Sequence, residues 1–412
     1  MENLGWQYFM KNNKLTLFLV QFIGVIATIT ATTVIAGQFS AGFATSDISP
    51  KKGEQMLTIL NGAQLTDKID DLILVKALVL SDGKHRMALV VVDAIALYQD
   101  NFNTLLEVLY QQHDFDYVTI SVTHTHSGFF SENRASALNQ IIIDAVLMAD
   151  NQLTPVKIGA AQTSIDESYN RIVHKADGAE MLWINPKRIK TRPVDNTLNV
   201  VHFKTLDEQP FLSWVFYNAH PVVTMALNHV VISADYPGQM ANVIQQNIGS
   251  EVLFSLGAAG DVNPYDANTT PVAFSMQKSK EMGTKLANEA IRAINSIEDY
   301  QSQGQFSFVS KQFKQPDASV GVIRLTPTIG LAHFPGEYFN DFAVQLRQGS
   351  PFEFTLFMSM TNGNLGYVPT AEATVKGGYG ADLSELIVNE NTGQQHVEYA
   401  VTSLKEMVIP RH

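Results

Sequence analysis

Short apolar runs alternate with stretches of helical periodicity along most of this chain, beginning near residue 38. Residues 86–92 are apolar almost without interruption, which is typical of a strand covered on both faces of a sheet. Further apolar or alternating runs predict strands at 72–80, 117–122, 157–162, 199–204, 212–217, 251–256, 305–313, 320–325, 330–333 and 352–358. The pattern therefore predicts a chain rich in short, largely buried strands.

Helical spacing of apolar residues separates several of these strands. Leu105, Leu106 and Leu109 mark a helix over 102–112. The same periodicity predicts helices at 139–148, 239–246 and 277–294, and one that begins near 337. A strand, a helix and a strand in succession over 86–122 predict a parallel pair with a right-handed crossover. We expect an α/β fold, with a mixed β-sheet core flanked by helices in a single large domain and an active site at the carboxyl ends of strands.

The N-terminal segment has a different composition. Lys11 and Lys14 precede an uncharged apolar run over 15–37, and Val34 to Ala36 supply small residues for cleavage. A secretory signal peptide and an uncleaved membrane anchor both fit this pattern. In both cases the protein is exported, either secreted, periplasmic or anchored to the membrane through 15–37. We therefore divide the chain into a leader, 1–37, and a single large domain, 38–412.

Composition narrows the class of partner and of metal site. The 412 residues carry a net charge of −12 without basic runs, which argues against nucleic acid as a partner. The chain has no cysteine, so disulfides, thiolate metal sites and a cysteine nucleophile are excluded. Any metal must be held by histidine and oxygen ligands. The oligomeric state does not follow from composition.

The sequence Ser121 to Gly128 contains the clearest chemical signal. His124 and His126 are separated by one residue after a predicted strand. On an extended backbone both side chains point to the same side and can offer ring nitrogens to one metal ion. The alternative is a pair of hydrogen-bonded histidines in a turn.

Three further polar residues follow predicted strands in the same way. His220, Asn263 and Glu337 each lie just past an apolar run, and each has a glycine or proline beside it. Each has a structural alternative: a turn histidine, a structural loop or a carboxylate in the first turn of a helix. Together with His124 they indicate a catalytic zinc site at converging strand ends, with an open position for water.

An ordered set of motifs then resembles the N-terminal catalytic domain of the neutral/alkaline, non-lysosomal ceramidases. The matching stretches, which cover almost all of the chain after the leader, are FSAGFATSDISP (39–50), HTHSG (124–128), YNR (169–171), AHP (219–221), SADYPG (233–238), GDVNP (260–264), PGE (335–337) and GYVPT through GGYG (366–380). The resemblance implies a hydrolase of sphingolipid metabolism that acts on an N-acyl lipid, in particular an N-acylsphingosine.

The resemblance also implies roles for individual residues. Zn²⁺ would be held by His124, His220, Glu337 and Tyr379. The candidate catalytic residues are His126, Arg171 and Asn263. His126 would face the substrate or the zinc water and move a proton, and Arg171 would hold a substrate oxygen or a developing oxyanion.

The chain departs from the family pattern at three positions. Asn263 stands where the ceramidases carry a serine that is regarded as essential to the amide chemistry. Asparagine is no nucleophile, but it can donate to an oxyanion or position a water. Phe129 replaces the proline that follows HTHSG, and a tyrosine expected near Ala371 is absent.

We therefore expect a zinc-dependent amidohydrolase that resembles neutral ceramidase and uses a zinc-activated water. The alternative is an exported zinc- or ligand-binding protein on the ceramidase fold that has no catalytic activity. A two-metal phosphoesterase would require more aspartate and histidine ligands than the strand ends supply.

Overall fold

The computed structural model describes most of the chain from Gly37 onward. The described residues are 37–58, 62–66, 68–128, 132–225, 231–267 and 272–408. Residues 1–36 of the expected leader therefore lie outside the described residues, and so does Phe129.

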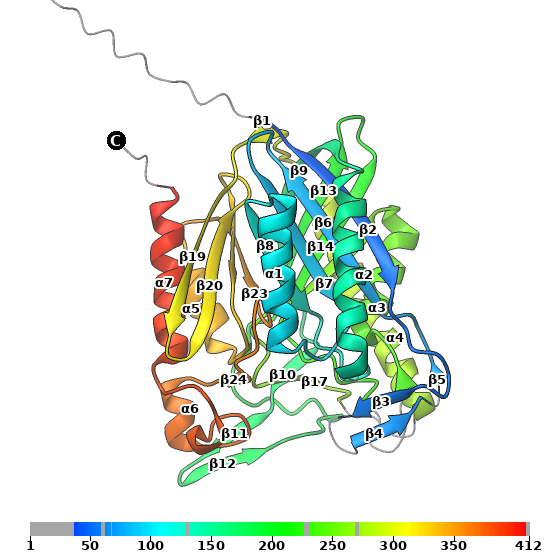
Figure 1. The fold of residues 1–412 in the computed structure, drawn as a ribbon. Helices are drawn as coiled ribbons and strands as arrows, with labels where there is room; N and C mark the ends of the chain where they lie inside the picture. Colours follow the sequence, from blue (N-terminus) through cyan, green and yellow to red (C-terminus); the bar gives the residue numbers. More distant parts are fainter. Residues whose placement is uncertain are drawn as a thin grey trace, which may run out of the picture. The chain divides into compact units, whose positions relative to one another are not determined.

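An eight-stranded mixed sheet organises the domain (Figure 1), in the order β16-β14-β13-β9-β2-β6-β7-β8. One half consists of β2 (Ser40–Asp47), β6 (Leu74–Ser81), β7 (Arg86–Val92) and β8 (Tyr117–Val122). The other half consists of β9 (Thr154–Ser164), β13 (Thr197–Thr205), β14 (Pro210–Tyr217) and β16 (Glu251–Leu256). The pairs β7–β8 and β14–β16 are parallel, and the other neighbours are antiparallel.

The two halves are joined at one corner. β2 and β9 pair only where both begin, through Ser40 with Pro155 and Ala41 with Thr154. From that corner both strands run downward in Figure 1. The carboxyl ends of β8, β14 and β16 therefore lie at the same end of the domain, although β8 and β16 are at opposite edges of the sheet.

A second, four-stranded sheet packs beside the first in the order β19-β20-β21-β23. Its strands are β19 (Ser307–Lys314), β20 (Asp317–Arg324), β21 (Ile329–His333) and β23 (Phe354–Met358). Side chains from both halves of the large sheet and from this sheet form one apolar cluster, which includes Leu89, Trp214, Leu331 and Leu356. Burial of this inner cluster holds the two sheets together.

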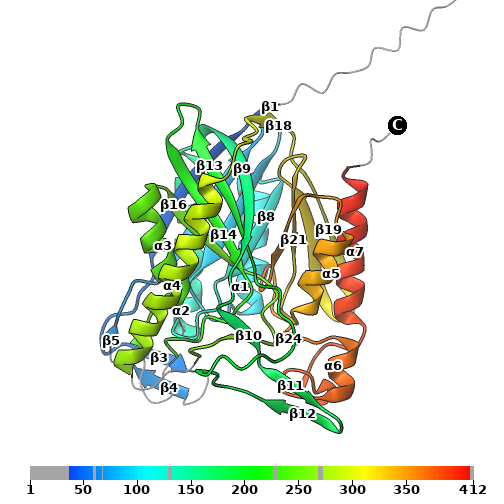
Figure 2. The same ribbon diagram turned by 180° about the vertical axis from the view of Figure 1, so that it is seen from behind.

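Helices cover the outer faces (Figures 1 and 2). α1 (Gln99–His113) and α2 (Glu132–Asp150) pack on the β2–β8 half, whereas α3 (Asp235–Ile248) and α4 (Val272–Asn295) pack on the β9–β16 half. α5 (Asp341–Gly349) and α7 (Thr392–Glu406) cover the second sheet. Within the described ranges, no helix has both the length and the apolar character to cross a membrane.

Short strand pairs extend the fold at the end where the main strands finish. Those nearest the candidate site are β10 (Ser168–Asn170) with β17 (Val262–Pro264), and β22 (Glu337–Tyr338) with β24 (Tyr367–Val368). The remaining short elements are β1 (Gly37–Gln38), β3 (Gln55–Thr58), β4 (Gly62–Leu65), β5 (Lys68–Ile69), β11 (Ile172–Lys175), β12 (Gly178–Met181), β15 (Val231–Ile232), β18 (Gln303–Gly304), α6 (Ala371–Lys376) and the 3₁₀ turn η1 (Leu383–Glu385).

The predicted fold class is confirmed, and so is the parallel pair on either side of α1. β7 is covered on both faces, since Leu89 and Val91 point to the inner cluster and Val90 and Val92 to the helices. The helix expected near Glu337 is present as α5, but its predicted start is wrong. Glu337 begins β22, and its N–H donates to the Gly366 carbonyl at 2.8 Å. The helix starts only at Asp341, because a long-range strand pair takes the backbone groups of the preceding residues.

Candidate metal centre

His124 and His126 lie in the loop that follows β8. The loop is tied to two points between β14 and α3, because the His126 N–H donates to the Pro221 carbonyl at 3.0 Å and the Thr125 hydroxyl to the Ser233 carbonyl at 2.8 Å. Gly128 is required by packing, since a Cβ atom there would lie 2.8 Å from the Asp93 carbonyl oxygen. The sequence HTHSG thus forms a fixed turn between two strand ends.

The backbone of His124 has φ of +64°, a left-handed conformation that non-glycine residues seldom adopt. Strain of this kind persists where the surrounding structure enforces it, and it concentrates at functional sites. The conformation turns the ring inward, so that His124 is almost fully buried.

His220 and Glu337 come to the same point from two other parts of the fold. His220 follows β14 and is fully buried, whereas Glu337 follows β21. Its carboxylate oxygen Oε2 lies 3.0 Å from His220 Nε2 and 3.3 Å from His124 Nε2. His126 Nε2 lies 3.4 Å from His124 Nε2. The three imidazoles form a group whose ligand atoms all lie within 4.8 Å of one another.

These separations suit a tetrahedral metal site. Zinc–nitrogen bonds of roughly 2.0–2.1 Å in tetrahedral geometry put neighbouring ligand atoms about 3.3 Å apart. Nitrogen and carboxylate donors of this kind fit zinc, although imidazole also suits other first-row metals. The donor set therefore fits a divalent metal ion.

The outer nitrogens of two histidines are fixed by backbone carbonyls. His124 Nδ1–H donates to the Ile95 carbonyl at 2.6 Å, and His220 Nδ1–H donates to the Val262 carbonyl at 3.1 Å. Because a carbonyl only accepts, Nδ1 carries a proton in both rings, and Nε2 is the nitrogen that faces the centre. This arrangement of ligand and supporting carbonyl is usual in metal sites.

Protonation states in the site favour binding of a cation. Burial lowers the pKa of His220 to about 4, and burial, with the neighbouring imidazoles of His124 and His220, holds the pKa of His126 well below its usual value. Burial alone would raise the pKa of Glu337, but His124 and His220 together hold it well below its usual range. His126 and His220 are therefore neutral and Glu337 is ionised near pH 7, which is the state that a metal requires.

His126 lies closer to the centre than the resemblance implied. Its Nε2 belongs to the histidine group, and its buried Nδ1 has no hydrogen-bond partner among the described residues. A buried ring nitrogen without a partner is costly unless a ligand or water satisfies it. His126 is thus placed either as a third imidazole ligand or beside a water at the open position.

Arg171 and Asn263 form the adjoining polar wall. β10 pairs with β17, so that Tyr169 lies opposite Asn263 and Arg171 follows directly. Arg171 Nη1–H donates to Asn263 Oδ1 at 3.2 Å, and Nη2–H donates to the Gly260 carbonyl at 2.7 Å. Arg171 Nε is buried without a partner among the described residues, so its N–H is a donor that a ligand can satisfy.

Aromatic rings enclose the Arg171 guanidinium. Trp183, Tyr367 and Tyr379 lie with their ring centres 5.2–5.5 Å from its central carbon. Tyr367 and Trp183 were missed in the sequence, although Tyr367 belongs to the GYVPT motif and pairs with Glu337 across β22 and β24. Burial raises the pKa of Tyr367 well above its usual value, so its hydroxyl is a donor at neutral pH.

Tyr379 is placed differently from the other predicted ligands. Its side chain is 48% exposed, and its ring packs edge-on against Trp183 and Tyr367. With Trp183 it also lines an open cleft of about 670 Å³ between β12 and the segment 374–385. The structure brings His124, His220 and Glu337 together, whereas a metal bond from Tyr379 stays a prediction.

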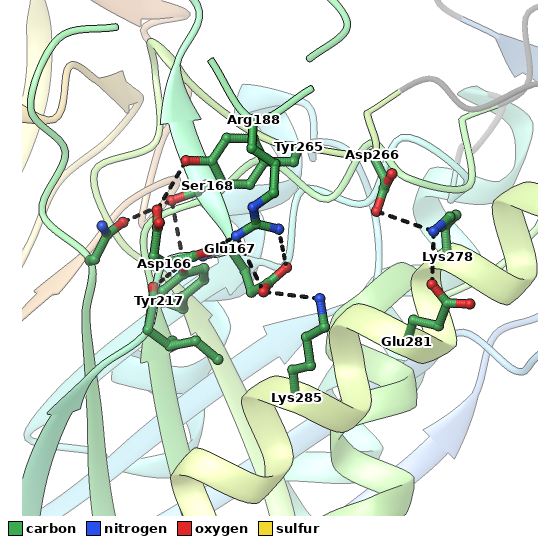
Figure 3. A network of polar contacts seen from close by, with 12 residues as sticks. Asp166, Glu167, Ser168, Arg188, Tyr217, Tyr265, Asp266, Lys278, Glu281 and Lys285 are labelled. Atoms are coloured by element: carbon green, nitrogen blue, oxygen red, sulfur yellow. Dashed lines mark hydrogen bonds and ion pairs between the residues drawn. The ribbon is translucent and has the colours of Figure 1, made fainter. Parts of the chain in front are cut away.

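A polar network supports the strand that carries Asn263 (Figure 3). Arg188 stacks on the Tyr265 ring at 3.9 Å and donates to Glu167 at 3.1 Å, and Lys285 donates to the same carboxylate at 3.0 Å. Tyr265 also stacks on Tyr169 and donates to Asp166 at 3.0 Å. These contacts join β10, the loop after β17 and α4, and they fix the position of Asn263 from outside the site.

Comparison with solved structures identifies the fold. No protein-family model matches the chain, and no curated protein matches it. A structure described as a ceramidase complexed with C2 matches with a TM-score of 0.74 and 15% identity, over 91% of this chain and 76% of that one. The neutral ceramidase of Pseudomonas aeruginosa matches with a TM-score of 0.74 and 15% identity, over 90% and 75%. This chain therefore has the fold of the neutral ceramidases.

Proposed function

We propose that the protein is an exported, zinc-dependent amidohydrolase that cleaves the amide bond of an N-acyl lipid of the N-acylsphingosine class. The observation that carries the proposal is the convergence of His124, His126, His220 and Glu337. In the order His220 Nε2, Glu337 Oε2, His124 Nε2 and His126 Nε2, each atom lies 3.0–3.4 Å from the next. The shared fold with ceramidases supports the choice of an amide over other bonds.

A bound divalent ion supplies Lewis-acid polarisation of a carbonyl and lowers the pKa of water toward neutrality. The residues around it supply the rest. His126 has a depressed pKa and is therefore a neutral imidazole that can accept a proton and return it to the leaving amine. Arg171 remains charged and presents its guanidinium to a developing oxyanion.

Asn263 holds Arg171 rather than acting as a nucleophile. Its Oδ1 accepts the Arg171 Nη1–H at 3.2 Å, and its backbone pairs with that of Tyr169 across β10 and β17. A serine hydroxyl is shorter and would leave the guanidinium freer. The proposal is therefore hydrolysis by an activated water, with Asn263 as the group that orients Arg171.

The cleft beside Arg171 and Asn263 is the place that we propose for the chain attached to the substrate carbonyl. The cleft shares Trp183 and Tyr379 with the aromatic enclosure of Arg171. Val375 and Leu383 add apolar surface, and its charged lining residues are Lys376, Asp382 and Glu385. A carbonyl held near Arg171 would have its attached chain next to these side chains. This arrangement supports an amphiphilic substrate with one polar reacting group.

The test combines metal content with hydrolysis. Purified protein is treated with chelator, reloaded with Zn²⁺, and assayed on fluorescent N-acylsphingosine and on shorter N-acyl amides. We expect chelator-sensitive hydrolysis that Zn²⁺ restores, and a fall in kcat of about 100-fold or more in Arg171→Lys, which keeps the charge but loses the planar fork. Arg86→Lys, on a partly exposed ion pair with Asp150, is the matched control.

A metal- or ligand-binding protein without catalysis is the second candidate. The observation in its favour is that Asn263 replaces the expected serine and accepts one of the Arg171 N–H hydrogen bonds. Stoichiometric metal in a protein that is inactive on the whole panel would support this candidate.

A further inference from the structure

Asp261 is a fully buried carboxylate between the strand that leads to Arg171 and the chain that follows Glu337. Its Oδ1 accepts the Asn340 N–H at 2.8 Å, and its Oδ2 accepts a hydrogen bond from the Asn170 side chain. Its backbone carbonyl accepts the Arg171 N–H at 2.8 Å. One residue thus binds the immediate neighbour of Arg171 and a residue three positions beyond Glu337.

The preceding glycine makes the same two connections through its backbone. The Gly260 N–H donates to the Tyr338 carbonyl at 2.8 Å, and its carbonyl accepts the Arg171 Nη2–H at 2.7 Å. A Cβ atom on Gly260 would lie 2.4 Å from the Glu337 carbonyl oxygen. Gly260 and Asp261 therefore fill the space between the strands of Arg171 and Glu337 completely.

The partners of Asp261 are themselves fully hydrogen-bonded. Asn170 Oδ1 accepts the Ile172 N–H at 2.9 Å. Asn340 Nδ2–H donates to the Ala258 carbonyl at 2.8 Å, and its Oδ1 accepts the Asp195 N–H at 2.7 Å. Each of these amides therefore has a fixed orientation, and a change of donor or acceptor at Asp261 cannot be absorbed by rotating a neighbour.

We propose that Asp261, paired with Asn170, is a positioning residue that fixes the Arg171 guanidinium relative to the Glu337 carboxylate. The inference rests on the proposed function, because it concerns the distance between the oxyanion-binding group and the metal ligand. Asp261 acts through its neighbours, since its own carboxylate is fully buried. Errors of about 1 Å between reacting groups can cost on the order of 100-fold in rate, so such a device has a direct effect on kcat.

The first variant is Asp261→Asn, which preserves shape. The new amide must accept from the Asn340 N–H, so its NH₂ group faces Asn170. If Asn170 flips to offer its oxygen, its own NH₂ then faces the Ile172 N–H. Two donors confront each other in either orientation, and the spacing of the strands must change. We expect kcat to fall tenfold or more, KM to stay within threefold and metal stoichiometry to remain unchanged.

The second variant exchanges the two side chains, Asp261→Asn with Asn170→Asp. Asn at 261 then donates to the carboxylate at 170 and still accepts from Asn340, while the carboxylate at 170 accepts the Ile172 N–H. All three hydrogen bonds are restored, and only the one between positions 261 and 170 has its donor and acceptor reversed. We expect the exchange to recover kcat to within threefold of the wild type.

A readout that needs no substrate accompanies the kinetics. In Co²⁺-loaded protein, the visible absorption spectrum reports the geometry of the metal ligands, including Glu337. We expect the spectrum to change in Asp261→Asn and to return in the exchange variant. Asp177→Asn, an identical change in the exposed turn between β11 and β12, is the control and should leave both readouts unchanged.

The outcomes separate the two proposals. If the wild type hydrolyses no N-acyl substrate, the proposed function fails, and the Co²⁺ spectra alone decide the role of Asp261. Normal kcat and an unchanged spectrum in Asp261→Asn overturn the positioning role. A less stable Asp261→Asn variant with normal kcat per metal-loaded molecule also overturns the positioning role, because Asp261 would then support only the stability of the fold. If Asp261→Asn does not fold, an active exchange variant supports the proposal, and an exchange variant that also fails to fold overturns it.

Discussion

His220 Nε2 lies 3.0 Å from Glu337 Oε2, although the two residues are 117 positions apart in the chain. One follows a strand of the large sheet and the other a strand of the second sheet. His124 Nε2 lies 3.3 Å from the same Glu337 oxygen, and these three side chains define the centre of the site.

Removal of one imidazole tests this centre. In His220→Ala the remaining donors cannot complete a tetrahedral site, so we expect metal affinity to fall by more than the roughly 10–100-fold that loss of an outer partner costs. Zn²⁺ at about 100 times its dissociation constant stabilises a binding protein by about 2.7 kcal/mol, and this gain should vanish in the variant. Metal analysis and thermal unfolding with and without Zn²⁺ measure both effects. His113→Ala, at the end of α1, should behave as the wild type, and full metal content in His220→Ala would refute the site.

Asn263 is tested by two substitutions. Asn263→Ala removes the acceptor for Arg171 Nη1, and we expect kcat to fall about 100-fold, as for loss of an oxyanion group. Asn263→Ser restores the family's residue and should raise turnover of N-acylsphingosine above that of the alanine variant. Kinetics on fluorescent ceramide and on short N-acyl amides provide the measurement. Wild-type kcat in Asn263→Ala would remove this side chain from the mechanism.

Tyr379 is tested as a metal ligand by Tyr379→Phe, which keeps the ring against Trp183 and Tyr367 but removes the hydroxyl. The flanking Gly377, Gly378 and Gly380 all have left-handed φ angles, which glycine adopts without strain. We expect the variant to bind Zn²⁺ at least tenfold more weakly, measured by competition with a chelating dye. Unchanged affinity would assign Tyr379 to the wall of the cleft alone.

Acid should lower the free energy of unfolding through His396, a buried histidine outside the site. Burial lowers the pKa of His396 to about 4, whereas in the unfolded chain it is near 6.5. Between these values the unfolded state binds more protons, so this residue's contribution to the free energy of unfolding falls as pH falls from about 6.5 to about 4. The loss is at most about 1.4 kcal/mol per pH unit.

The variant His396→Gln isolates this effect from other titrating groups. Asp71, whose pKa burial raises to about 6, titrates in the same window in both proteins and cancels in the difference. Between pH 7 and pH 4.5 we expect wild type to lose up to about 2–3 kcal/mol more than His396→Gln, measured by urea unfolding of metal-free protein. Parallel pH curves for the two proteins would contradict a neutral buried imidazole.

The boundary of the folded domain is tested by truncation. Gly37 pairs with Gly304 in β1 and β18, so a chain that begins at Gly37 should fold. Removal of three more residues deletes Phe39, which is fully buried and stacked on Phe306 with ring centres 5.0 Å apart. We expect this shorter chain to lose roughly 3–5 kcal/mol, measured by urea unfolding. Equal stability of the two would show that β1 and Phe39 are dispensable.

Local pattern alone determined most of the strands and helices. The runs at 86–92, 117–122 and 251–256 coincide with β7, β8 and β16, because buried strands of a mixed sheet are continuously apolar and bounded by polar turns. The same pattern marked His124, His220 and Glu337, since each polar residue stands directly after or close to the end of an apolar strand. The residue types and their positions after strands were therefore readable without a structure.

Tertiary structure alone decided which of these strand ends meet. The divergence of β2 from β9 brings the carboxyl ends of β8 and β14 to the same end of the domain, and nothing in either strand's sequence specifies that corner. Pairing of β22 with β24 places Tyr367 beside Glu337 and delays the start of the predicted helix to Asp341. The left-handed turn at His124 and the buried carboxylate of Asp261 likewise depend on partners far away in the chain. Periodicity records which side chains are buried, whereas the contacts between buried groups from distant segments are fixed only when the sheets pack.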